Sequence, residues 1–228
     1  MQMLKNNNRS FGHITSSIFT KNELNQAKWL TIRSVWLNVY PYPRDNMEYL
    51  YNIYNTSNIC EICRKGIVQN KCFSIEKKPK WGQRNFFMLN LITDELFISN
   101  KVASIFQENN ITGIEYFDVY YKKNEKINDT KQLFIKCKLA PGLNEKSIKE
   151  ITTCKKCNNK SFFLKPDFVY INKQAFDNVN VDIIKSHEIF GQNTYGNLLL
   201  INKKIYDIIM KHKIDKNLVF EPVVLIDN

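Results

Sequence analysis

The chain of 228 residues contains little arginine, glycine or histidine. It also lacks the phosphate-binding pattern G-x-x-x-x-G-K-[ST], the hydrolase pattern G-x-S-x-G, the zinc-protease pattern H-E-x-x-H and the dinucleotide pattern G-x-G-x-x-G. The histidines, His13, His187 and His212, are isolated from one another, and a lone histidine is more often structural than catalytic. We therefore expect a binding protein and not an enzyme, with no small-molecule substrate.

Long apolar segments are also missing. No run of about 18 apolar residues occurs, and residues 1–10 have no continuous apolar stretch of the kind found in secretory signals. We therefore expect a cytoplasmic protein that does not enter a membrane. Hydrophobic residues make up 43% and aromatic residues 13% of the chain, which is the composition of a folded protein.

The charge is strongly basic. Lysine and arginine number 33 against 22 acidic residues, a net charge of +11, which favours phosphate backbones, anionic membranes or an acidic partner protein. The excess is mostly lysine, however, and the abundant Asn, Ile, Lys, Phe and Tyr have A/T-rich codons, so genome composition can account for much of the charge. Base readers use arginine in preference, and the five arginines are scattered. We therefore do not expect nucleic acid as the main partner.

The most informative pattern is a pair of CxxC motifs, formed by Cys60 and Cys63 and by Cys154 and Cys157. One CxxC turn aims two thiolates at a point, and two such turns complete the tetrahedral shell that zinc requires. Cys63 and Cys154 are 91 positions apart, far beyond the roughly 15–20 residues of a compact zinc ribbon. A folded segment must therefore lie between the motifs. We predict that these four cysteines bind one structural Zn²⁺ with no open position for water.

Two other interpretations of the motifs remain open. The thiols can be reduced and metal-free, because Arg64 and Asn158 follow the motifs in place of the usual glycine. A redox dithiol is less favoured, since neither motif opens a helix after a buried strand. For Cys72 and Cys137 we expect buried, small apolar side chains and not ligands.

A second signal is an internal repeat. Residues 94–119 resemble residues 197–223 at an offset of 103 positions, as between Val102 and Ile205, with one residue inserted near the end. In each copy the apolar period changes from two to about 3.6 and back, which predicts strand, helix and strand. Ser99 and Asn202 are the expected helix N-caps. A CxxC motif precedes each copy, so the chain looks like a duplication.

These patterns predict an α+β fold of duplicated strand-helix-strand units that share a four-cysteine zinc knuckle site. Residues 1–50 form an N-terminal extension that packs on the core, and within it residues 22–39 are expected to form a helix. Residues 51–139 and 140–228 are the two CxxC-containing halves of one compact, two-lobed unit. Exposed basic loops are expected around residues 77–81 and 122–126.

The CxxC pairs, the segments at 96–99 and 111–119, and the ending at 199–202 and 218–223 together resemble the double-CXXCG motif proteins, which are immunity proteins of bacterial toxin–immunity systems. The resemblance covers roughly residues 50–226 and departs from the family motif at Arg64 and Asn158, where the family has glycine. It implies a non-enzymatic cytoplasmic protein that binds and neutralises one cognate toxin, with the cysteines as metal ligands. The alternative is a zinc-ribbon nucleic-acid-binding protein.

Overall fold

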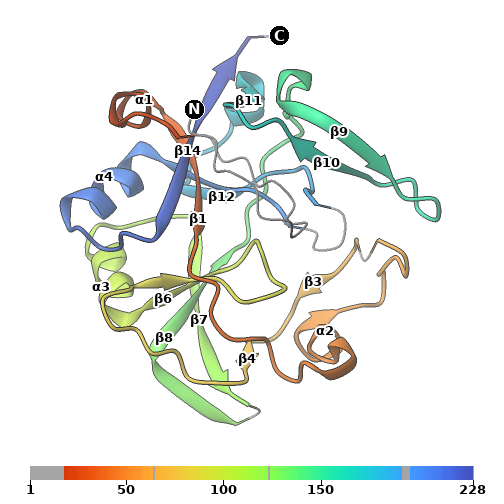
Figure 1. Cartoon of the computed structure of the whole chain (residues 1–228), viewed down its shortest axis with the longest axis vertical. Helices are drawn as coiled ribbons and strands as arrows, with labels where there is room; N and C mark the ends of the chain where they lie inside the picture. The colour runs from red at the N-terminus through yellow and green to blue at the C-terminus, as the bar shows by residue number, and fades with distance from the viewer. Residues whose placement is uncertain (1–17, 64, 123, 192–195, 228) are drawn as a thin grey trace, which may run out of the picture.

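The computed structural model describes residues 18–63, 65–122, 124–191 and 196–227. Two five-stranded sheets dominate it, one in the lower and one in the upper part of Figure 1. Sheet I contains, in spatial order, β4 (Ser74–Ile75), β7 (Ile114–Tyr121), β8 (Glu125–Ile135), β6 (Leu96–Ser99) and β5 (Phe86–Phe87). Sheet II contains, in spatial order, β11 (Val169–Asn172), β14 (Leu218–Ile226), β1 (Trp29–Ser34), β13 (Leu199–Asn202) and β12 (Ile183–Lys185). The expected α+β class is confirmed.

The two sheets have the same pattern of neighbours. In sheet I the central strand β8 runs antiparallel to both β6 and β7, and in sheet II the central strand β1 runs antiparallel to both β13 and β14. Each sheet ends in one parallel edge pair, β4 with β7 and β11 with β14. Each also ends in one antiparallel edge pair, β5 with β6 and β12 with β13.

The two expected helices form where the repeat places them. α3 (Asn100–Glu108) follows β6, and α4 (Lys203–Lys211) follows β13. Ser99 and Asn202 lie at their N-cap positions. The Asn202 side chain accepts a hydrogen bond from the backbone N–H of Ile205 at 3.3 Å, whereas the Ser99 side chain makes no capping hydrogen bond, contrary to the expectation. Their buried side chains recur at helical spacing: Val102, Ala103, Ile105 and Phe106 in α3, and Ile205, Tyr206, Ile208 and Ile209 in α4.

The main hydrophobic core joins the two sheets. Leu30 and Ile201 of sheet II lie in one cluster with Leu96 and Leu133 of sheet I, together with the buried faces of both helices. A second cluster lies under sheet I and α2 (Tyr49–Ile53), and a third lies on sheet II. The shared core makes the described chain one packed unit, as burial of one continuous apolar interior requires.

The expected helix over residues 22–39 is wrong. Only α1 (Lys21–Gln26) is helical there, and a capping box formed by Thr20 and Glu23 caps its N-terminus. Residues 29–34 form β1 instead. β1 pairs on both sides, with β13 and with β14, so its backbone groups are satisfied within the sheet. The N-terminal part of the described chain thus supplies the centre of sheet II.

Two short hairpins project from the sheets toward each other. The first consists of β2 (Tyr54–Asn55) and β3 (Val68–Gln69), and the second of β9 (Ile148–Thr153) and β10 (Lys160–Leu164). Single 3₁₀ turns cover Asp45–Met47, Glu145–Ser147 and Lys173–Phe176. Within the described ranges, none of the helices has the length and apolar character needed to cross a membrane.

Candidate metal centre

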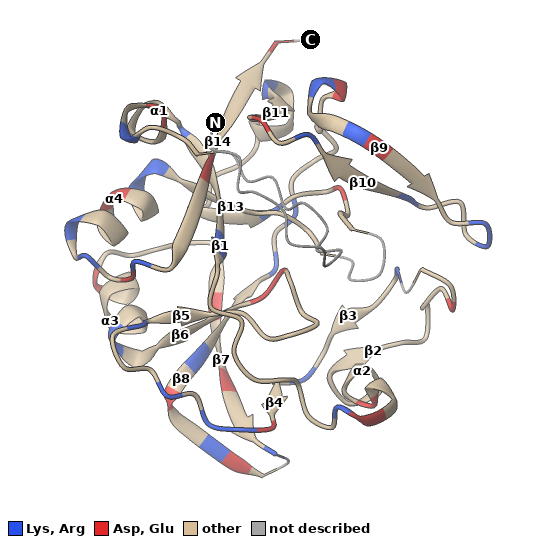
Figure 2. Cartoon of the chain, viewed as in Figure 1, with Lys and Arg blue, Asp and Glu red and all other residues tan. Residues whose placement is uncertain are grey.

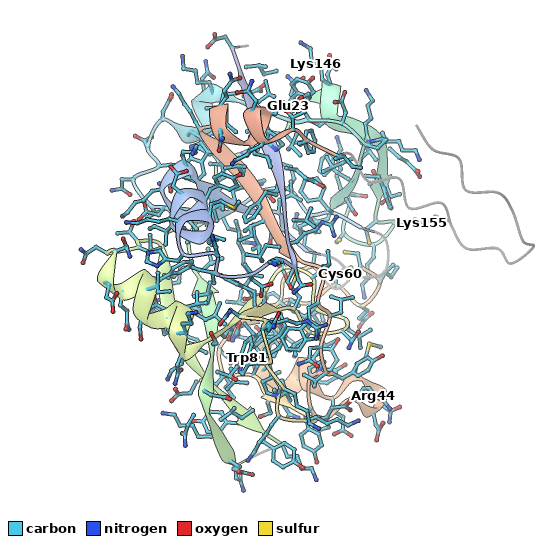
Figure 3. All side chains as sticks on the ribbon, turned by 60° about the vertical axis from the view of Figure 1, so that its left-hand side comes forward. Glu23, Arg44, Cys60, Trp81, Lys146 and Lys155 are labelled. Atoms are coloured by element: carbon cyan, nitrogen blue, oxygen red, sulfur yellow. The ribbon has the colours of Figure 1, made fainter. Side chains whose placement is uncertain are left out.

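Each CxxC motif occupies the connection of one of these hairpins. The backbone N–H of Cys60 donates to the carbonyl of Lys65 at 2.9 Å, and that of Cys154 donates to the carbonyl of Asn159 at 2.9 Å. Both turns thus close over the same number of residues. Figure 3 shows Cys60 at mid-height in the molecule, between the lobe that carries Lys146 and the lobe that carries Arg44.

The four predicted ligands meet at one point. Their sulfur atoms all lie within 4.8 Å of one another. The Sγ atoms of Cys60 and Cys154 are 3.7 Å apart, and those of Cys63 and Cys157 are 3.4 Å apart. A tetrahedron with Zn–S bonds of about 2.3 Å has sulfur atoms about 3.8 Å apart, whereas a disulfide requires about 2.05 Å. The sulfur positions therefore fit a four-coordinate ion and exclude a disulfide.

Backbone conformation explains how the second turn forms without a glycine after Cys157. Asn158 has φ +57°, the left-handed conformation that Asn tolerates better than other residues with a side chain. In the first hairpin Gly66 has φ +101°, and a Cβ atom there would lie 2.2 Å from the carbonyl oxygen of Asn58. Only glycine fits at position 66. Arg64 lies outside the described residues.

The protein environment shifts the pKa values of three of the cluster's thiols in different directions. Burial raises the pKa of Cys63 to about 12. The backbone N–H of Asn159 lowers the pKa of Cys157 to about 6, and the Asn159 side-chain Nδ2 also donates to this sulfur at 3.1 Å. Backbone N–H groups of Cys157 and Lys156 lower the pKa of Cys154. The second hairpin therefore supplies thiolates readily, while Cys63 needs a cation to replace its proton.

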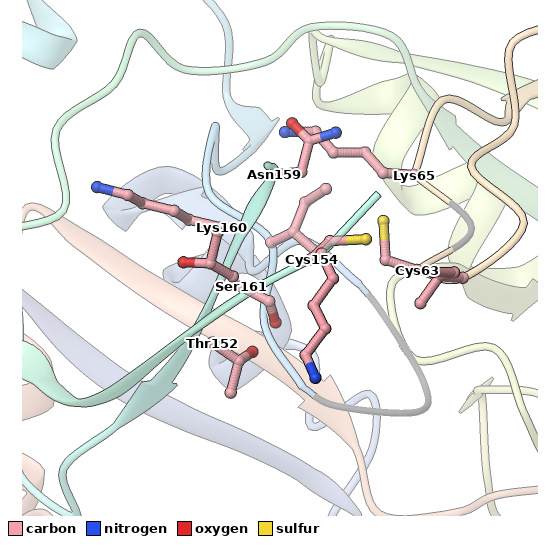
Figure 4. Close-up of a pocket in the computed structure, with 11 residues that line it drawn as sticks. Cys63, Lys65, Thr152, Cys154, Asn159, Lys160 and Ser161 are labelled. Carbon is pink, nitrogen blue, oxygen red and sulfur yellow. The ribbon is translucent and has the colours of Figure 1, made fainter. Parts of the chain in front are cut away.

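Charged side chains surround the sulfur cluster. Glu61 of the first hairpin pairs with Lys156 of the second, so an exposed ion pair bridges the two turns. A cavity of about 250 Å³ opens beside the cluster, and its wall includes Lys65, Lys155 and Lys160. Figure 4 shows the sulfur atoms of Cys63 and Cys154 at the edge of this cavity. A divalent ion with four thiolates carries a charge of −2, which these lysines offset.

A metal ion bound by all four thiolates would be structural. Four thiolates complete a tetrahedral shell, so no position remains for a water molecule or a substrate. Thiolate donors select zinc, iron or copper(I) over magnesium or calcium. Two ligands come from each half of the chain, so a bound ion would connect hairpins that are far apart in the sequence. The sequence predicted these four residues but not the Glu61–Lys156 bridge or the Asn159 contact, for which no motif exists.

Neither of the other two cysteines joins the cluster. Cys72 is half-buried, and burial raises its pKa. Cys137 is exposed, so the expectation that it is buried is wrong. The alternation that buries Leu133 and Ile135 stops because β8 ends at Ile135, and the chain leaves the sheet before residue 137.

The histidines stay apart from the cluster in the described chain. His187 and His212 are both exposed, and His13 lies outside the described residues. Glu188, which follows His187, accepts hydrogen bonds from the backbone N–H groups of Gly142 and Leu143 at 2.9 and 3.0 Å. This carboxylate thus anchors a loop. No family model matches the chain, and no curated protein matches it.

Proposed function

We propose that this protein is a cytoplasmic immunity protein that binds and neutralises one cognate bacterial toxin by direct contact, and that it uses structural zinc to hold its shape. The observation that carries the proposal is the meeting of both CxxC pairs at one point between the hairpins. This arrangement is what the resemblance to the double-CXXCG motif proteins implies for Cys60, Cys63, Cys154 and Cys157.

Zinc is the preferred ion because four thiolates in tetrahedral array form its commonest structural site. The ion replaces the thiol protons and fixes β2–β3 against β9–β10. Each hairpin is short, and an isolated two-stranded hairpin is marginal in water. Zinc would therefore stabilise two elements with little core of their own.

The two halves are proposed to be duplicated units. Hydrogen bonds support this, because Ser99 and Asn202, which are 103 positions apart, make the same bonds to Asn85 and Asp182, which are 97 positions apart. Ser99 donates to the side chain of Asn85 at 2.8 Å, and its equivalent Asn202 donates to the side chain of Asp182 at 2.8 Å. The backbone N–H groups of Ser99 and Asn202 also donate to the carbonyls of Asn85 and Asp182, at 3.1 and 2.9 Å.

Contacts between the halves are reciprocal as well. Thr112, after α3, donates from its backbone N–H to Asp182 at 2.8 Å. Its repeat equivalent Asp215, after α4, accepts from the backbone N–H of Asn85 at 2.6 Å. Equivalent positions 112 and 215 thus each contact the opposite unit. Reciprocal contacts of this kind are characteristic of two units related by a two-fold axis. In this proposal the units are residues 51–139 and 140–228, and β1 completes the second sheet as β8 completes the first.

Neutralisation in this proposal is steric and electrostatic. A preformed surface covers the toxin's active region or holds an inactive conformation, with aromatic anchors at its centre and a charged rim. The chain's charge of +11 disfavours a strongly basic toxin and favours an acidic or mixed partner domain.

Co-expression tests the proposal. The product of the adjacent gene should arrest growth when expressed alone, and this protein should restore growth and form a 1:1 complex in calorimetry. The double variant Cys60→Ser/Cys154→Ser, which removes one ligand from each hairpin, should lose rescue, whereas Cys137→Ser should keep it. A neighbouring product that neither arrests growth nor binds contradicts the proposed function.

A further inference from the structure

A basic groove lies on the lobe of sheet I, away from the cysteine cluster. It has a volume of about 690 Å³, within the range of ligand sites, and is lined by Trp36, Asn38, Val39, Lys77, Lys78, Lys80, Arg84 and Tyr121. The lysines and Arg84 belong to the connection between β4 and β5, where Figure 2 shows a series of blue positions. Neither the sulfur cluster nor the main core uses these side chains.

The groove is built on fixed backbone. The N–H of Met88 donates to the carbonyl of Trp36 at 3.1 Å, and the N–H of Asn38 donates to the carbonyl of Met88 at 2.9 Å. Residues 36 and 38 therefore project to one side of an extended segment. Trp36 also packs edge-on against Trp81 and Phe87, with ring centroids 5.7 and 5.6 Å apart. Figure 3 shows Trp81 in this lobe. The backbone of the groove is therefore in place before a ligand binds.

Two cations of the groove lie over aromatic rings, and one of these two also pairs with a carboxylate. The Arg84 guanidinium lies 4.7 Å from the centroid of the Trp36 ring, and Lys78 lies 5.6 Å from that of Tyr121. Lys78 also pairs with Glu125. Among the described residues, Lys77, Lys80 and Arg84 have no carboxylate within salt-bridge distance. The positive potential of the groove is therefore left for a ligand.

An unsatisfied donor points to the chemistry of that ligand. The Asn38 side-chain Nδ2 is buried and has no hydrogen-bond partner among the described residues. A buried donor without a partner is costly, and a carboxylate or peptide carbonyl oxygen would satisfy it. Single-stranded nucleic acid needs open aromatic faces for base stacking. Trp36 and Tyr121, the rings that line the groove, already carry cations over them.

We propose that this groove binds a carboxylate-rich segment of a partner protein, with Lys80 and Arg84 as the main charge contacts and Asn38 as the hydrogen-bond donor. The binding chemistry stands on the groove alone. Only the identity of the partner as a toxin rests on the proposed function.

The test uses a fluorescein-labelled decaglutamate peptide and measures anisotropy at 50 and 300 mM salt. The peptide should bind the full chain and weaken with salt, and Lys80→Glu/Arg84→Glu should weaken it at least tenfold. The control Lys146→Glu/Lys149→Glu, on exposed positions of the other lobe, carries the same charge change and should alter affinity less than twofold. Asn38→Ala should weaken binding without changing the salt dependence.

Several results would overturn the groove assignment. They are no binding at 50 mM salt, equal losses in the two double variants, or tighter binding of a ten-residue oligothymidylate than of the peptide. The neutral Lys80→Gln/Arg84→Gln variant, checked by its melting temperature, separates loss of binding from loss of folding. If the peptide binds as expected but no toxin is found, the proposed function fails and the groove stands. If the toxin binds both double variants equally, the groove fails and the function stands.

Discussion

Removal of the proposed metal ion should strongly lower the stability of this protein, and the size of the effect follows from the cross-link that the ion would make. An ion held by all four cysteines joins Cys63 to Cys154 and so closes a loop of 91 positions in the unfolded chain. The chain-entropy relation for a cross-link of that length gives about 4.6 kcal/mol. For a protein of this size, each kcal/mol shifts the melting temperature by about 2–4 °C.

The expected loss on chelation is therefore roughly 9–18 °C in melting temperature. The assay is calorimetry of the purified protein before and after dialysis against EDTA, with metal content measured by mass spectrometry. Thiol titration gives an independent count. Only the exposed Cys137 and the half-buried Cys72 should react before chelation, and all six thiols afterwards.

Matched variants separate the ion from general thiol effects. Cys154→Ser should reproduce most of the loss, while Cys137→Ser should leave the melting temperature within about 2 °C, as surface substitutions do. The reasoning is refuted if the protein contains about one equivalent of metal and chelation leaves its melting temperature unchanged. It is also refuted if four thiols react at once in protein that was never exposed to a chelator.

Three further predictions concern single side chains. Lys185→Met leaves the buried carboxylate of Glu95 without its partner and should cost about 3–5 kcal/mol in urea unfolding, most of which Glu95→Leu should restore in the double variant. Hydrogen bonds from Lys126 and Lys131 lower the pKa of Asp118 in the folded protein. The stabilisation that the ionised Asp118 contributes is therefore present above its unfolded pKa of about 3.9. It is lost as the pH falls through the lower pKa of the folded state. Asp118→Asn should therefore lower stability by about 1 kcal/mol at pH 7 and by progressively less as the pH falls below the unfolded value, as measured by denaturation across this range. Asn158→Gly should keep metal content and melting temperature, whereas Asn158→Val should lower both, because Val disfavours φ +57°.

The sequence was most informative where local chemistry and periodicity coincide. The buried stripes of α3 and α4 follow from apolar spacing, and the cysteine ligands follow from thiolate pairs whose geometry needs a second pair. Asn202 was found because a cap needs a short polar side chain at one position, whereas the Ser99 hydroxyl donates to Asn85 and does not cap its helix. For the helices and caps the cause lies within a few residues of the effect, and for the cysteines each CxxC motif is itself local although the two motifs are far apart in the sequence.

The failures have non-local causes. β1 was expected to be helical because nothing in residues 22–39 shows that β13 and β14 will flank it, more than 160 positions away. Tertiary pairing overrides a weak helical pattern in such a segment. The groove was missed for the same reason, since Trp36 and Asn38 meet Lys80 and Arg84 only after residues 36–38 pair with Met88.

The origin of the ligands decides what the metal can do. A compact ribbon takes all four cysteines from one short segment, so the ion contributes to the folding of that segment alone. Here each hairpin supplies two sulfurs, and sulfur pairs 3.7 and 3.4 Å apart join Cys60 to Cys154 and Cys63 to Cys157, each at a separation of 94 positions. Neither half can complete the shell by itself. The shared core already joins the two sheets, so the binding energy of an ion must appear as fixation of one hairpin against the other, and a surface that spans both hairpins would lose its shape without the ion.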